Sequence, residues 1–204
     1  MSFDYLIKIA LIGPPCVGKS SLILRYVDET FEYNQPTTLG LDFRTKNLIL
    51  FDKQVQLQIW DTAGQERYTN ALNFSVYKSV DAFILVFDLT DKKSLEDLSR
   101  FLVEINQNCS PDILLSFIGN KSDLVDEIEI ENPEEQLRKL IQNNFSFDKT
   151  SAKDGTNVDK VFEFVAKTII ERKPKKQPKK EKKEEIPQNI ITIESSVPKK
   201  KKCC

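Results

Sequence analysis

The sequence predicts an α/β fold: a mostly parallel sheet of about six strands, with one antiparallel edge strand and helices on both faces. Two observations favour it. Short apolar runs alternate with amphipathic stretches along most of the chain, which is typical of strands joined by crossover helices. The exception is a pair of strand-like runs separated by only two residues. That spacing indicates a hairpin, and so an antiparallel strand at the edge of the sheet.

The individual elements follow from the spacing of apolar residues. Six runs are expected as strands: residues 5–12, 41–51, 54–60, 82–87, 113–118 and 145–147. Asp52 and Lys53 are the expected turn of the hairpin. Four stretches have helical spacing, at residues 19–28, 94–108, 133–142 and 157–172. Ser94 is expected to cap the second of these helices, and Pro133 lies in the first turn of the third, where proline is allowed.

The formal net charge of −1 conceals two parts of opposite sign. Up to residue 171 the balance is −9, whereas residues 172–204 carry +8. From residue 173 onward Pro, Lys and Glu dominate, which disfavours a packed core. We therefore expect one domain over residues 1–172 and a flexible basic tail over residues 173–204. The sequence has no apolar run near the roughly 20 residues of a membrane span, no secretory signal and no disulfide pattern among its four cysteines, which favours a reducing cytosol.

Residues 13–20 read G-P-P-C-V-G-K-S, between an expected strand and an expected helix. This spacing is typical of a phosphate-binding loop, in which backbone N–H groups, a helix N-terminus and a lysine surround the phosphates. Ser20 supplies a hydroxyl for Mg²⁺. Pro14 and Pro15 have no N–H to donate. The expected phosphate contacts are therefore Cys16, Val17, Gly18, Lys19, Ser20 and Ser21.

Further polar residues follow other strands, at the end where ligands bind in such sheets. Asp61 follows the apolar run 57–60 and could hold Mg²⁺ directly or through water. Gly64 could offer its N–H to the γ-phosphate, and Gln65 could orient an attacking water. Thr37 and Thr38 both lie in the loop expected over Mg²⁺, and we choose Thr38 from its place before Leu39-Gly40. Each of the six glycines lies in or beside one of these loop segments.

The segments 120–123 (N-K-S-D) and 151–153 (S-A-K) indicate a guanine site. Guanine carries two adjacent donors, N1–H and the 2-amino group, and a carboxylate such as that of Asp123 can accept from both. Adenine lacks this pair and would leave the carboxylate unpaired. The expected base contacts are Phe31, Asn120, Lys121, Asp123, Ser151, Ala152 and Lys153.

These segments resemble the Ras superfamily of small GTPases and, within it, the Rab branch. Residues 39–43 (L-G-L-D-F) are similar to the Rab pattern I-G-V-D-F, and residues 57–68, 119–124 and 150–153 also fit. The resemblance implies a Ras-like P-loop GTPase fold, with GTP/GDP and Mg²⁺ as cofactors. It implies slow GTP hydrolysis stimulated by an activating protein, and a switch role in vesicle trafficking. Ser20, Thr38 and Asp61 would be the metal ligands and Gln65 the catalytic residue, with switch segments at 32–44 and 64–78.

The resemblance also implies partners and a location. The partners would be an exchange factor, a GTPase-activating protein, Rab escort protein, GDP-dissociation inhibitor and effectors. Residues 199–204 (K-K-K-K-C-C) resemble a doubly geranylgeranylated terminus on Cys203 and Cys204. Two lipids would hold the protein on the cytoplasmic face of an intracellular membrane, with a cytosolic pool. Nucleic acid is not expected as a partner, because the tail lacks aromatic residues for stacking.

Two hypotheses stay open at this point. One is a trafficking GTPase with a slow cycle. The other is a nucleotide-locked adaptor that recruits partners but scarcely hydrolyses GTP. Pro14 and Pro15 depart from the small or polar residues that are usual in Rab proteins and favour the adaptor, whereas Gln65 favours the GTPase.

Overall fold

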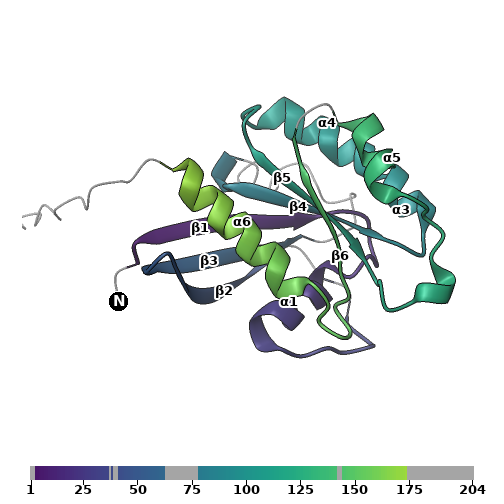
Figure 1. Ribbon diagram of the computed structural model, residues 1–204, viewed down its shortest axis with the longest axis horizontal. Coiled ribbons are helices and arrows are strands. Elements are labelled where there is room, and N and C mark those ends of the chain that lie inside the picture. Colours follow the sequence, from purple (N-terminus) through teal and green to yellow (C-terminus); the bar gives the residue numbers. More distant parts are fainter. Residues whose placement is uncertain (1–2, 37, 39–40, 63–77, 142–143, 174–204) are drawn as a thin grey trace, which may run out of the picture. The chain divides into compact units, whose positions relative to one another are not determined.

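The computed structural model describes residues 3–36, 38, 41–62, 78–141 and 144–173 (Figure 1). All lie in the first of the two units into which the chain divides, residues 1–174. The strands are β1 (Tyr5–Ile12), β2 (Leu41–Leu50), β3 (Lys53–Thr62), β4 (Ala82–Asp88), β5 (Leu114–Asn120) and β6 (Ser146–Lys149). The helices are α1 (Lys19–Asp28), α3 (Lys92–Glu96), α4 (Leu98–Asn108), α5 (Pro133–Leu140), α6 (Val158–Arg172) and the short 3₁₀ turn η2 (Val125–Glu127).

The six strands form one sheet in the order β2-β3-β1-β4-β5-β6. Every pairing is parallel except that of β2 with β3, which is antiparallel at the edge. The predicted α/β class, the number of strands and the antiparallel edge are therefore confirmed. Because the central strands run in one direction, the loops after β1, β3, β4, β5 and β6 all emerge at the same end of the sheet.

Helices cover both faces of the sheet (Figure 1). On one face α1 and α6 pack on a core that includes Ile7, Leu57 and Phe162, and on the other α3, α4 and α5 pack on a second core that includes Phe83 and Phe117. Strands β4 and β5 are buried along their whole length. This explains their continuous apolar runs, since a strand covered on both faces has no polar side.

Three local predictions were wrong. The single helix predicted over residues 94–108 is two helices, α3 and α4, which are separated by Asp97. The hairpin turn consists of Phe51 and Asp52 rather than Asp52 and Lys53, because Leu50 pairs with Lys53 and both turn residues have positive φ. Ser94 is not a helix cap. Asp91 caps α3, accepting a hydrogen bond from Lys93 N at 3.0 Å. Ser94 lies inside that helix, and its hydroxyl accepts a bond from Asp88 N at 2.9 Å, so tertiary contact determines its role.

Within the described residues, no helix is both long and apolar enough to cross a membrane.

Tyr26 places a buried hydroxyl in the core between α1 and α6. Its ring stacks on Phe162 with centroids 4.2 Å apart, and only 1% of the residue is exposed. Its hydroxyl has no hydrogen-bond partner among the described residues. Burial, with smaller contributions from Asp159 and Glu163, raises the pKa of the Tyr26 phenol.

We expect Tyr26→Phe to raise the free energy of unfolding by about 1 kcal/mol, because it removes a buried hydroxyl without changing the ring. Chemical denaturation would measure the change, with Tyr5→Phe, at a partly buried position, as the control. A loss of stability in Tyr26→Phe would show that the hydroxyl has a partner and would contradict this account.

Candidate functional site

A cavity of about 420 Å³ opens at the end of the sheet where the loops gather. Its wall is formed by the loop before α1, the chain between α1 and β2, and the loops after β5 and β6. Twelve of the residues predicted from the sequence line it: Cys16, Gly18, Lys19, Ser20, Ser21, Phe31, Thr38, Asn120, Lys121, Asp123, Ala152 and Lys153. Segments more than a hundred residues apart are thus brought around one space.

The loop before α1 is held by close backbone contacts. A Cβ on Gly13 would lie 2.1 Å from the carbonyl oxygen of Val86, and one on Gly18 would lie 2.4 Å from Nδ2 of Asn120. Both glycines also have positive φ, 147° and 94°, which L side chains rarely adopt. Gly18 immediately precedes α1, so the N-terminus of this helix opens into the cavity, as phosphate binding requires.

Lys19 is buried at this end of the cavity. Its Nζ donates to the carbonyl oxygens of Gly13 at 2.9 Å and Pro14 at 2.7 Å. Burial lowers the pKa of Lys19 to about 8, and Asp61 and Cys16 partly oppose the change. Both hydrogen-bond acceptors of this buried ammonium are neutral carbonyl groups, so they offset only part of the cost of burying its charge. This position therefore favours an anionic ligand.

Three oxygen-bearing side chains meet beside Lys19. The Ser20 hydroxyl donates to Asp61 Oδ2 at 2.6 Å and lies 2.8 Å from Thr38 Oγ1, and Thr38 donates to the same Oδ2 at 3.3 Å. The second carboxylate oxygen of Asp61 is buried and has no partner among the described residues. Burial raises the pKa of Asp61, against the effects of Ser20, Lys19 and Thr38.

At the other end of the cavity Asn120 joins three loops. Its Nδ2 donates to the Val17 carbonyl at 2.8 Å. Its Oδ1 accepts from Thr150 Oγ1 and from Ala152 N, each at 3.2 Å. Val17 and Ser151 do not line the cavity. Each instead binds a residue that does: the Val17 carbonyl accepts from Asn120, and Ser151 Oγ donates to Asp123 Oδ1 at 2.7 Å.

The carboxylate of Asp123 is therefore fixed from two sides, by Ser151 and by Lys153, whose Nζ lies 3.8 Å from Oδ2. Asp123 is only 14% exposed at its side chain, yet it lines the cavity. A partly buried carboxylate held by side-chain donors is well suited to accept hydrogen bonds from a flat ligand with two adjacent N–H groups.

Asp88 and Tyr33 are among the residues of this site that were not predicted from the sequence. Asp88, at the end of β4, pairs with Lys121 Nζ at 2.6 Å. Tyr33 lines the cavity and lies under Lys153, with Nζ 5.7 Å from the ring centroid. A signal for Asp88 existed, because it follows an apolar run at the same end of the sheet as the other predicted residues. Tyr33 gave no signal beyond being aromatic.

Four predicted residues lie outside the part of the chain that the structure describes: Gly64, Gln65, Cys203 and Cys204. In the described ranges no three His, Cys, Asp or Glu side chains gather as a metal-binding group. The candidate metal ligands are instead two hydroxyls and one carboxylate.

Comparison with known proteins agrees with this geometry. Residues 8–171 match the model of the Ras family. The chain is similar to GTP-binding protein ypt3 of Schizosaccharomyces pombe, 37% identical over 80% of this chain and 75% of the relative. It is also similar to Ras-related protein RabQ of Dictyostelium discoideum, 34% identical over 98% of both chains. Ras-related protein Rab-10 of Diplobatis ommata is 34% identical over 100% of this chain and 98% of its own. The chain therefore belongs to the Ras family, in the Rab branch of small GTPases, whose members bind and hydrolyse GTP as switches in vesicle trafficking.

Proposed function

We propose that GTP and GDP bind in the cavity with their phosphates at Lys19 and their guanine at Asp123. This proposal rests on one observation: the side chains at the two ends of the cavity carry opposite charges. A buried ammonium and a helix N-terminus suit phosphate, and a fixed carboxylate suits the two donors of guanine. Cys16 through Ser21 would contact the phosphates. Around the base would lie Phe31, Asn120, Lys121, Asp123, Ser151, Ala152 and Lys153.

Ser20, Thr38 and Asp61 would hold Mg²⁺, directly or through water. Their oxygens already lie within 2.6–3.3 Å of one another, and oxygen is the ligand that Mg²⁺ prefers. The buried Asp61 oxygen without a partner also fits a cation. When bound, Mg²⁺ would supply positive charge that offsets the negative charge of the phosphates. The residues' own part is to hold the loop of Thr38 against the start of α1.

For hydrolysis, Gln65 would orient the attacking water and Gly64 would donate its N–H to the γ-phosphate. The support is their place in the sequence, three and four residues after Asp61. The reaction would be slow and would be stimulated by an activating protein. An exchange factor would release GDP, and effectors would recognise the segments 32–44 and 64–78 in the GTP form.

A second candidate is the nucleotide-locked adaptor. Pro15 lines the cavity, and neither Pro14 nor Pro15 can donate a backbone hydrogen bond there. A binding module that holds GTP without turning it over would still recruit effectors. It would differ from a cycling switch only in its rate of hydrolysis, so kinetics separate the two.

The tail would anchor the protein to membranes. Cys203 and Cys204 would each carry a geranylgeranyl group, and two lipids give stable attachment where one is marginal. Lys199, Lys200, Lys201 and Lys202 would add about 1 kcal/mol each near an anionic leaflet. Rab escort protein would present the chain for lipidation, and GDP-dissociation inhibitor would keep a cytosolic pool. The location would be the cytoplasmic face of an intracellular membrane, and no nucleic acid would bind.

Base choice tests the nucleotide assignment. We expect the protein to prefer GTP to ATP by on the order of 10⁴-fold, since adenine leaves Asp123 unpaired. Asp123→Asn should lose most of this preference and gain affinity for xanthosine triphosphate, because an amide can donate to the 2-oxo group. Competition binding measures both. Asp126→Asn, a nearby exposed change, should leave the preference intact. Equal affinity of the parent for GTP and ATP would contradict the guanine site.

Single-turnover hydrolysis separates the cycling switch from the adaptor. In a cycling switch Gln65→Leu should slow GTP hydrolysis on the order of tenfold or more, because the attacking water loses its orienting group. Gln136→Leu, on α5, is the matched control and should hydrolyse at the parent rate. If Gln65→Leu and the parent hydrolyse at the same slow rate, with and without an activating protein, the adaptor is the better description.

Membrane attachment has its own test. We expect Cys203→Ser combined with Cys204→Ser to make the protein soluble while leaving GTP binding unchanged. Changing only Lys199–Lys202 to glutamine should weaken attachment, most visibly at low salt, because screening already reduces this contribution at high salt. Sedimentation with membranes measures both. A double cysteine variant that still sediments like the parent would contradict the lipid anchor.

A further inference from the structure

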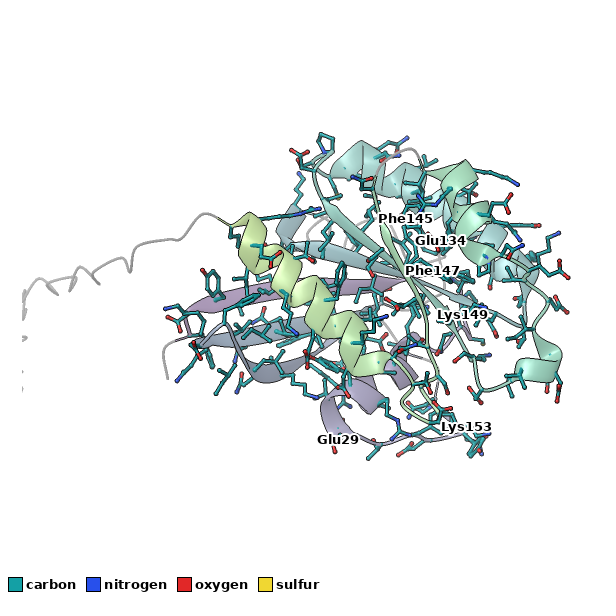
Figure 2. All side chains as sticks on the ribbon, in the orientation of Figure 1. Glu29, Glu134, Phe145, Phe147, Lys149 and Lys153 are labelled. Carbon is teal, nitrogen blue, oxygen red and sulfur yellow. The ribbon has the colours of Figure 1, made fainter. Side chains whose placement is uncertain are left out.

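Arg25, near the end of α1, bonds three main-chain carbonyl groups at once. Its Nε donates to the Ala152 carbonyl at 2.8 Å and its Nη2 to the Lys153 carbonyl at 2.6 Å. Its Nη1 donates to the carbonyl of Glu29, the residue that follows α1, at 2.9 Å. Figure 2 labels Glu29 and Lys153, which lie at the same end of the molecule. One side chain thus joins α1, the start of the loop toward β2, and the loop after β6.

A guanidinium is well suited to this set of contacts. It presents five N–H donors in a rigid planar fork, whereas a lysine ammonium is a point charge on a flexible stem. The bonds are also charge-assisted, which makes them shorter and stronger than bonds between neutral groups. The Arg25 side chain therefore fixes the orientation of the two peptide groups whose carbonyls it binds.

Those two peptide groups belong to the loop that bounds the base end of the cavity. Ala152 is 4% exposed and its N–H is held by Asn120. Lys153 lies against both Asp123 and the ring of Tyr33. With Asn120 on one side of Ala152 and Arg25 on the other, the loop is held at both ends of this residue. A loop ordered before the ligand arrives binds more tightly, because no ordering has to accompany binding.

We propose that Arg25 is a positioning residue for the nucleotide: it holds the Ala152–Lys153 segment in place, and so slows release of the guanine base. This inference rests on the proposed function, taken one step further: the Ala152 N–H, whose bond to Asn120 is long at 3.2 Å, would also donate to the guanine 6-oxygen. Arg25 itself does not line the cavity, so it acts through the loop. The same helix starts at Lys19 and Ser20, and Arg25 therefore also links the phosphate end of the site to the base end.

Nucleotide release from the purified full chain tests the proposal. We expect Arg25→Met to accelerate GDP dissociation about tenfold, the scale of one lost charge-assisted hydrogen bond. Arg25→Lys, with the charge but without the fork, should give an intermediate rate. Arg138→Met is the matched control: Arg138 pairs with Glu134 of α5 at 2.6 Å, and no residue of that helix lines the cavity, so GDP release should not change.

A second ligand, 6-thioguanosine diphosphate, distinguishes positioning of the base contact from a merely structural role of Arg25. In this analogue a sulfur, which is a weak hydrogen-bond acceptor, replaces the 6-oxygen. The parent should release this analogue faster than GDP, and Arg25→Met should accelerate its release by at most about twofold, since the affected contact is already weak. Equal acceleration of both ligands, or an unchanged GDP rate, would overturn the role of Arg25. A parent that does not distinguish the two diphosphates would overturn the Ala152 contact, and with it this inference. A parent that binds ADP as well as GDP would instead contradict the proposed function.

Discussion

The hydrogen bonds of the Asn120 side chain are the constraint on which the rest of the site depends. This amide is 1% exposed and connects the phosphate loop, through Val17, to the loop after β6, through Thr150 and Ala152. A buried amide left without partners would destabilise the fold by about 1–3 kcal/mol, so the three segments are held together by the need to satisfy it. The absence of a side chain at Gly18 follows from the same constraint, because Asn120 occupies the space that a Cβ would need.

Electrostatics acts in the same direction at the phosphate end. Lys19 and Asp61 are both buried, and burial disfavours the charged form of each. Each nevertheless stabilises the charge of the other, and the Ser20 and Thr38 hydroxyls support the carboxylate. A buried charge that its neighbours offset only in part favours a ligand of opposite charge. Part of the nucleotide affinity would therefore come from offsetting the buried charge. Under the proposed function GTP, the ligand of this family, would bring such charge to Lys19.

The two ends of the site are connected through α1. The helix begins at Lys19 and Ser20 and, six residues after Lys19, presents Arg25 to the loop at the base end. Asp88, at the end of β4, pairs with Lys121, which follows the neighbouring strand β5. Residues outside the cavity therefore position those inside it.

The sequence by itself determined the class of fold, the order of strands and helices, and the loops that form the site. It could do so because hydrophobic periodicity and glycine requirements are local properties of the chain. Gly13 and Gly18 signalled a close backbone approach before any contact was known. The motif positions also predicted the edge of the sheet at which Ser20, Asn120, Asp123 and Ala152 would gather, since the carboxyl ends of parallel strands share one edge of the sheet.

Only the tertiary structure decided which of these residues touch one another and which others support them. Ser94 carries a good capping side chain, but Asp91 and the backbone of Asp88 determine where the helix begins and what the Ser94 hydroxyl binds. The hairpin turn lies one residue earlier than predicted, because strand register is set by pairing across β2 and β3. Arg25 gave no signal, because an arginine at helical spacing resembles any solvated residue. Its role depends on a loop 127 residues away, and contacts at that separation arise only when the sheet brings the two segments together.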